Sequence, residues 1–172
     1  MAKAAVTASE YGSVVDSETI SDETSKTEIT WTVYDSGKLV IEGTGVTPDW
    51  SPWFNYKEDI TDVIIGDGIT ALGERNFMNY PTLKTVTVKG NLSKIGNSAF
   101  EGCTALRSVK VKESTMIMLG EYTFLNCTAL TDADLPGSKM KSIGSKAFWG
   151  CTSLNKFDFS DVSRIQDFAF AN

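Results

Sequence analysis

The chain alternates apolar and polar positions in short stretches that recur every 23–24 residues. The clearest stretches read L-x-x-V-x-V, as at Leu83, Val86 and Val88, and this alternation predicts a β-strand with one buried face. A second apolar anchor follows in each unit, and a phenylalanine stands five residues after it. The anchors are Leu72, Ile95, Leu119, Ile143 and Ile165, and the phenylalanines are Phe77, Phe100, Phe124, Phe148 and Phe170.

The units are residues 60–82, 83–105, 106–129, 130–153 and a truncated 154–172. A period of this length built on leucine-like anchors is typical of a leucine-rich-repeat solenoid. We therefore expect an α/β repeat fold with a parallel β-sheet on one face and short helical turns opposite it. One unit cannot bury its own apolar stripe, so the phenylalanines should stack into a continuous core.

A different pattern precedes the repeats. Residues 29–34 alternate with period two, residues 35–37 supply turn chemistry, and residues 38–43 read as a return strand, which together predict a β-hairpin. With the aromatic segment 47–56, this hairpin should form an N-terminal cap over residues 29–59. Residues 1–28 are rich in Ser, Thr, Glu and Asp without apolar periodicity, and we expect a flexible leader with transient strand character around Val14–Val15.

Composition excludes several classes of function. Histidine is absent, which removes Ser-His-Asp and Cys-His catalysis and the common zinc sites. The net charge of −6 argues against a nucleic-acid partner. No apolar run approaches the roughly 20 residues that cross a bilayer, so we expect no membrane insertion by this segment. The first residues lack the apolar region of a complete signal peptide.

Three cysteines, Cys103, Cys127 and Cys151, each lie three residues after a phenylalanine. Their spacing of one repeat should stack them in a column about 5 Å apart. Three thiols in a line do not make a tetrahedral metal site, and we expect them to act as small buried hydrophobic groups.

The polar positions of the strands should point outward and form a solvated, mixed-charge face. We take them as candidate partner-binding residues together with Trp149, whose place just after a buried phenylalanine should also face outward. Asp134 and Asp158 should be neighbours, and Asp132 should face Lys156. An open, wet face neither shifts carboxylate pKa values nor excludes water, so we do not expect catalysis or calcium binding there. The candidates are Thr85, Thr87, Ser108, Lys110, Asp132, Asp134, Lys156, Asp158 and Trp149.

An alternative site lies in the aromatic segment before the repeats. Trp50, Trp53 and Tyr56 suggest a platform on which a sugar ring could stack. The same residues suit a structural role as well, because the first repeat must be covered at its apolar edge. Both interpretations remain open at the level of sequence.

The pattern I-G-x-x-A-F-x-x-C-x-x-L resembles the BspA-like leucine-rich repeats; it reads IGNSAFEGCTAL at 95–106 and IGSKAFWGCTSL at 143–154. The segment that begins WTVYDSGKLVIEG is also similar to the module that often introduces such arrays. Two units depart from the pattern, with Asn76 and Thr123 in place of alanine. In the last unit Gln166 replaces the recurring glycine, at a cost of about 1 kcal/mol if that glycine has positive φ.

The resemblance implies a secreted or cell-surface bacterial interaction protein, and no catalytic or cofactor residue comes with the family. We therefore expect a non-enzymatic, monomeric module for protein interaction or adhesion, without a cofactor. A carbohydrate-binding module and a structural spacer without ligand are the alternatives. The identity of a protein or glycan partner does not follow from the sequence.

Overall fold

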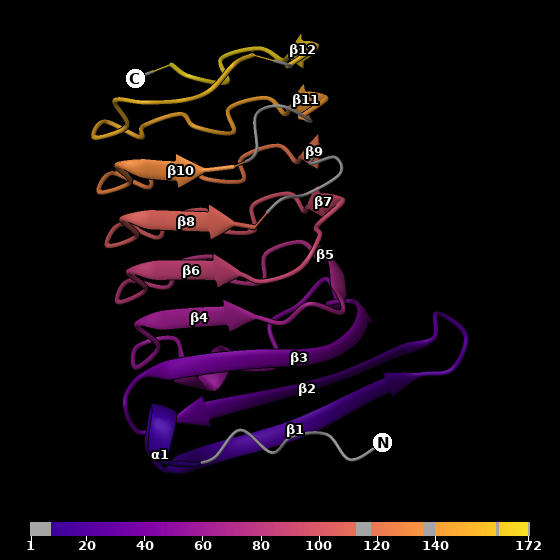
Figure 1. Cartoon of the computed structure of the whole chain (residues 1–172). Helices are drawn as coiled ribbons and strands as arrows, with labels where there is room; N and C mark the ends of the chain where they lie inside the picture. The colour runs from indigo at the N-terminus through magenta and orange to yellow at the C-terminus, as the bar shows by residue number, and fades with distance from the viewer. Residues whose placement is uncertain (1–7, 113–117, 136–139, 161, 172) are drawn as a thin grey trace.

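The computed structural model describes residues 8–112, 118–135, 140–160 and 162–171. Its coils stack in a single column, with the N-terminal strands at one end and β12 at the other (Figure 1). We number the coils as the repeats, from coil 1 (60–82) to coil 5 (154–172). The elements are α1 (Ala8–Tyr11), β1 (Val14–Asp22), β2 (Thr27–Tyr34), β3 (Lys38–Val46), the 3-10 helix η1 (Phe54–Tyr56), β4 (Asp62–Ile65), β5 (Ile69–Leu72), β6 (Thr85–Val88), β7 (Lys94–Ile95), β8 (Ser108–Val111), β9 (Met118–Leu119), β10 (Asp132–Asp134), β11 (Ser142–Ile143) and β12 (Arg164–Ile165).

Two faces of the column are sheets that share β3. The front sheet runs β1-β2-β3-β4-β6-β8-β10, antiparallel as far as β3 and parallel beyond it. The lateral sheet runs β3-β5-β7-β9-β11-β12 and is parallel throughout. The parallel solenoid and the N-terminal hairpin of β2 and β3 are therefore as predicted.

The phenylalanine column forms the core between the sheets. Adjacent rings from Phe77 to Phe170 stack with centroids 4.9–5.3 Å apart. All but the last ring are buried. The valines of the front sheet pack beside them because the strand register pairs Val63 with Val86 and Val86 with Val109. The predicted core is confirmed.

The predicted helical turns are wrong, and with them the α/β class. Within the described ranges the only helical elements are α1, four residues long, and η1, three residues long. The segment after each second anchor is a chain of tight turns, because a residue with positive φ interrupts it where a helix would need negative φ. Ser98, Tyr122 and Lys146 hold this position, with φ of 55°, 59° and 53°.

These turns are fixed by a regular pattern of backbone hydrogen bonds. The N–H groups of Ser98, Phe100 and Gly102 donate to carbonyls of the next coil over 2.8–2.9 Å. The N–H groups between them, such as that of Ala99, donate back within their own turn. Every second N–H group thus bonds to the next coil, and the N–H groups between them bond within their own turn. A helix could not link the coils in this way, because its N–H groups donate to carbonyls of the same helix.

The recurring glycine is required for close approach between coils and not for positive φ. Gly96, Gly120 and Gly144 are absent from the residues with positive φ. A Cβ added at Gly144 would lie 2.5 Å from the carbonyl carbon of Gly120 in the coil before it. At the corresponding position of the last coil, the side chain of Gln166 accepts a hydrogen bond from the Ser145 N–H over 3.1 Å.

The N-terminal region differs from the prediction of a flexible leader. Residues 14–22 form the nine-residue strand β1, which pairs antiparallel with β2. Hydroxyl pairs tie the two strands together, with Ser17 bonded to Thr32 and Thr19 bonded to Thr30. The polar composition that suggested a leader suits an exposed edge strand, since charged side chains discourage edge-to-edge association. Residues 1–7 lie outside the described part of the chain.

The aromatic segment belongs to a further, irregular coil that begins in β3. The first part of β3 pairs with β4 and its end pairs with β5, so this one strand supplies both strands of a coil. Trp53 then extends the phenylalanine column, stacked on Phe77 at 5.4 Å. Asn76 fastens this coil: its amide donates to the Pro48 carbonyl over 2.7 Å, and its backbone carbonyl accepts from Trp53 Nε1 over 3.2 Å. The departure from alanine at Asn76 is thereby explained.

The three cysteines are buried and free, and their thiols stack along the column. Each Sγ donates to a phenylalanine carbonyl one coil back over 2.9–3.1 Å. Burial raises the pKa of Cys103 and Cys151 to about 12 and that of Cys127 well above its usual value. The thiols therefore stay protonated at neutral pH and contribute as apolar groups.

These pKa shifts predict a loss of stability in alkali. The unfolded chain releases its thiol protons above about pH 9, while the folded chain holds those of Cys103 and Cys151 until about pH 12 and that of Cys127 well above pH 9. The contribution of the thiols to the free energy of unfolding is therefore fully present below pH 9. It falls as the pH rises from the pKa of the unfolded chain toward that of the folded chain, by about 1.4 kcal/mol per pH unit for each thiol. Urea unfolding at pH 8 and pH 10 measures this slope. Cys127→Ala should reduce the slope by one thiol's share, and an unchanged slope would contradict the assignment.

Candidate functional site

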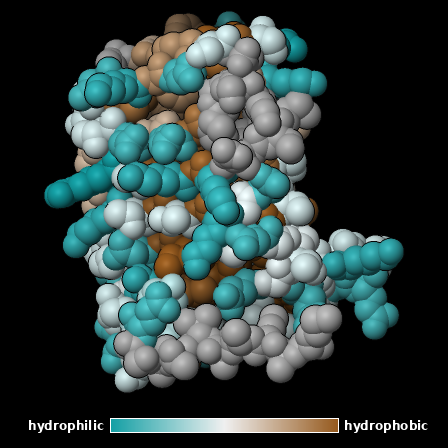
Figure 2. All heavy atoms as spheres, in the orientation of Figure 1, coloured by the Kyte–Doolittle hydropathy of each residue, from teal (hydrophilic) through white to brown (hydrophobic). Residues whose placement is uncertain are grey.

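The front sheet presents its polar side chains to solvent in two columns. The strand register aligns Asp62, Thr85, Ser108 and Asp132 in one column and Ile64, Thr87, Lys110 and Asp134 in the other. Polar side chains spread over this face in Figure 2, and the alternating valines beneath them point into the core. Parallel pairing in register explains the arrangement, because equivalent positions of each coil must lie side by side.

Six of the predicted partner-binding residues lie together on this face. Thr87, Lys110, Asp132 and Asp134 are exposed, and Thr85 and Ser108 are half-buried. The Thr85 hydroxyl donates to the Asp62 carboxylate. The Ser108 hydroxyl has no hydrogen-bond partner among the described residues, although it is covered by its neighbours.

Lys156 and Asp158 do not join the face, which corrects the expected pairing of Asp134 with Asp158 and of Asp132 with Lys156. The front sheet ends at β10, and residues 155–159 form no strand. The Asp158 carboxylate instead accepts from the Ser160 N–H over 2.9 Å, and hydrogen bonds from the Ser160 side chain and backbone lower its pKa.

The cause of this departure is the size of the side chains in coil 5. Phe157 and Phe159 stand where the earlier strands have smaller aliphatic side chains, from Val63 and Ile65 in β4 to Ala133 and Leu135 in β10. Phe157 packs edge-on against Phe148 and Phe170, with ring centroids 5.1 and 5.2 Å apart. The segment thus covers the end of the phenylalanine column, where Phe157 is half-buried and Phe159 stays exposed.

Trp149 lies on a different edge of the molecule, among the tight turns. It is half-buried, with its ring 5.7 Å from that of Phe168 and the Lys146 ammonium 5.1 Å from its centroid. Farther along this edge a shallow pocket of about 360 Å³ is lined by residues that include Met78, Tyr122 and Leu125. Trp149 is therefore separate from the columns of the front sheet.

The proposed sugar platform is not assembled as a set. Trp53 is fully buried in the core, Trp50 is 57% exposed, and Tyr56 is half-buried. The Tyr56 hydroxyl donates to Asp16 Oδ2 over 2.7 Å, and this hydrogen bond raises the pKa of the tyrosine. Since stacking requires an accessible ring face, Trp53 cannot contribute to such a platform in this fold.

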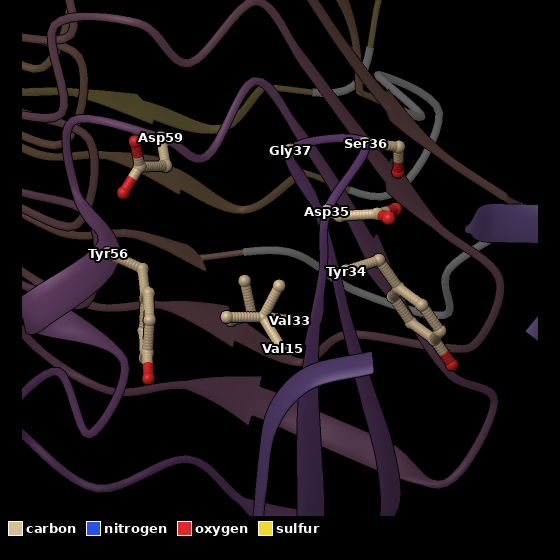
Figure 3. A pocket seen from close by; sticks show the side chains of 8 residues that line it. All are labelled: Val15, Val33, Tyr34, Asp35, Ser36, Gly37, Tyr56 and Asp59. Carbon is tan, nitrogen blue, oxygen red and sulfur yellow. The ribbon is translucent and has the colours of Figure 1, made fainter. Parts of the chain in front are cut away.

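A pocket of about 340 Å³ adjoins Tyr56, and sequence reasoning missed it. The Tyr56 ring stands opposite Val15 and Val33, with Asp59 near the rim (Figure 3). The pocket depends on β1, which places Val15 beside a turn more than 20 residues away in sequence. No local pattern indicates that contact.

The described residues contain no helix long and apolar enough to span a membrane. Within the same ranges, no group of three or more Cys, Asp or Glu side chains could hold a metal ion. We take the outward face of β4, β6, β8 and β10 as the candidate site because six of the nine predicted partner-binding residues lie together on it.

Two solved structures are similar to this chain. The chain is similar to a leucine-rich repeat protein from Eubacterium ventriosum, at 27% identity with a TM-score of 0.66, over 88% of this chain and 40% of that one. It is also similar to a leucine rich cell surface protein from Faecalibacterium prausnitzii, at 19% identity with a TM-score of 0.39, over 88% of this chain and 55% of that one. This chain thus spans well under two-thirds of either protein. No curated protein matches it.

The family is shown by the repeats themselves. The model of the BspA type leucine rich repeat region matches residues 51–172 in six copies. The match begins before coil 1 and so includes the aromatic segment that stacks Trp53 on Phe77. Since it covers most of the chain, this protein belongs to the BspA-type leucine-rich repeat family.

Proposed function

We propose that the chain is a non-enzymatic protein-binding module of a secreted or cell-surface bacterial protein, and that it binds through the outward face of the front sheet. The observation that supports this is the in-register column of Thr87, Lys110 and Asp134, exposed on three adjacent strands. A rigid sheet holds such side chains in fixed positions at little entropic cost on binding. Membership of the BspA-type leucine-rich repeat family supports the proposed surface location.

The size of the face limits the affinity of this segment. The four strands β4, β6, β8 and β10, about 4.8 Å apart, span roughly 14 Å, and an exposed width of about 16 Å gives on the order of 230 Å². A standard interface buries about 800 Å² on each partner. Binding by this segment should therefore be weak, or should include the loops beside the sheet.

Chemistry on the face is not part of the proposal. The chain contains no histidine, and the two aspartates that might have formed an acid–base pair, Asp134 and Asp158, belong to different structural elements. Paired carboxylates act in catalysis only where they flank a substrate at a fixed separation.

An array of purified extracellular proteins and glycans, probed with the fluorescently labelled chain, tests the proposal. Thr87→Trp places a large ring in the centre of the face, and we expect it to weaken binding to any protein target about 5-fold or more, because lost complementarity at an interface centre costs about 1 kcal/mol or more. Thr70→Trp on the lateral sheet is the matched control and should bind as the unmodified chain does. The thermal melts of both variants show that they are folded.

Three results would contradict the proposal. Binding unaffected by Thr87→Trp would place the site elsewhere. Binding to glycans alone, lost in Trp50→Ala, would favour the carbohydrate-binding alternative. An array without any signal at micromolar concentrations of the chain would favour the structural spacer.

A further inference from the structure

Charge on the front sheet is segregated by coil. Coils 2 and 3 carry only cations along their front strands, in segments 84–89 (KTVTVK) and 107–112 (RSVKVK). All five cations are exposed. They form what we call the basic patch, which consists of Lys84, Lys89, Arg107, Lys110 and Lys112.

The coils on either side carry the opposite charge. Coil 1 presents Asp62 and Asp67 around β4, and coil 4 presents Asp132 and Asp134 in β10. Four consecutive coils therefore read negative, positive, positive and negative across the sheet. This order is a property of the surface and not of the composition, since the chain as a whole has a net charge of −6.

The backbone holds the cations of the basic patch close together. The Arg107 N–H donates to the Lys84 carbonyl over 2.8 Å, and the Lys112 N–H donates to the Val88 carbonyl, next to Lys89, over 3.0 Å. The two strands lie about 4.8 Å apart, and the six residues from Lys84 to Lys89 span roughly 16 Å. The patch is thus a narrow band along the strands, with the hydroxyls of Thr85, Thr87 and Ser108 between its cations.

The basic patch has no anionic partner within the described chain. The one described ion pair joins Lys57 to Glu58, outside the patch. Asp134 lies beside Lys110 in the register, yet the two form no ion pair within 4 Å. Glu113 lies outside the described residues. Like charges on adjacent strands repel one another, and this repulsion would be relieved by an anionic partner.

We infer that the front sheet binds a protein surface with an acidic centre and basic flanks, an inference that rests on the proposed function. The acidic centre would lie on the basic patch, and the flanks would meet the carboxylates of coils 1 and 4. A uniform polyanion such as a sulfated polysaccharide fits poorly, because extending it across the strands brings it against Asp62 or Asp132. Complementary charge of this kind sets specificity and association rate more than affinity.

Synthetic peptides test this inference by fluorescence anisotropy. One peptide has a central block of aspartate and glutamate with lysines at both ends, and a second has the same composition with the charges interspersed. A heparin-derived oligosaccharide serves as the uniform polyanion. We expect the blocked peptide to bind tightest of the three, and its affinity to fall when salt is raised to about 150 mM, because exposed charges are screened.

The decisive variant is Arg107→Glu with Lys110→Glu, which reverses two charges inside the patch. The matched control is Lys94→Glu with Lys141→Glu, which makes the same change in net charge on the exposed lateral sheet. We expect the first to weaken binding of the blocked peptide by roughly 10-fold and the second by less than about 2-fold, since exposed charge pairs contribute up to about 1 kcal/mol each. Equal effects of the two variants would overturn the inference, and so would tighter binding of the heparin oligosaccharide.

Failure of the charge inference can be told from failure of the proposed function on the same array. A protein target lost with Thr87→Trp but retained with Arg107→Glu and Lys110→Glu would leave the face as the binding site and refute the acidic partner. A target retained with Thr87→Trp would refute the binding face itself, whatever the peptides do.

Discussion

Replacing Phe124 by alanine is expected to lower the free energy of unfolding by about 3–5 kcal/mol, the loss measured for large buried aromatic residues. Phe124 is fully buried at the middle of the column, with Phe100 on one side at 5.3 Å and Phe148 on the other at 5.2 Å. The variant therefore removes two ring contacts and leaves a cavity that two rigid coils cannot close. For a chain of this size the melting temperature should fall by roughly 6–20 °C.

Thermal and urea unfolding followed by circular dichroism measure this effect. Leu125→Ala is the matched control, because Leu125 follows Phe124 in the same turn but is half-buried, and it should cost much less. A repeat array is stabilised through contacts between neighbouring coils, so the Phe124 variant should also unfold over a broader range of urea. A melting curve that coincides with that of the unmodified chain would show that the phenylalanine column does not stabilise the fold.

The second large effect is expected at Gly144. A Cβ at this position would meet the carbonyl carbon and oxygen of Gly120 at 2.5 Å and the Glu121 nitrogen at 2.6 Å. All three atoms belong to the backbone of the preceding coil, so no side chain can turn aside, and the two coils must move apart. Gly144→Ala should therefore cost at least 1–3 kcal/mol, the usual penalty for overpacking.

Gly66→Ala is the control for this prediction. Its added Cβ would approach the Ile41 carbonyl oxygen no closer than 3.2 Å, and its backbone, like that of Gly144, has no positive φ. The loss of chain entropy on replacing glycine is thus similar in the two variants. If urea unfolding found them equally stable, close approach of the coils would not be the reason for the recurring glycine.

The regular part of the molecule could be predicted from the sequence because its contacts repeat. Phe100 touches Phe77 and Phe124, which occupy the same position one coil away. The repeat length therefore predicts which residues contact one another as well as where the strands lie. It also predicts that Thr87 lies beside Lys110 on the outward face.

The ends of the solenoid could not be predicted in this way. β1 is held by hydroxyl pairs and backbone bonds to β2, and its sequence VVDSETISD shows no apolar alternation. At the other end, Phe157 and Phe159 are two residues apart, as the inward positions of a strand would be. Their rings instead pack against Phe148 and Phe170 at the end of the phenylalanine column. An available signal was the spacing of Trp53 and Tyr56, three residues apart like Phe77 and Tyr80, which marks the additional coil.

The sequence by itself determined the repeat length, the buried column and the polar identity of the front face, since each depends on residues that recur at one spacing. Only the tertiary structure decided that the turns would not be helical and that the front sheet would stop at β10. The physical reason is that these features arise between coils. They depend on backbone hydrogen bonds, close backbone contacts and strand pairing with the neighbouring coil. The residue pattern within one repeat does not reveal these contacts.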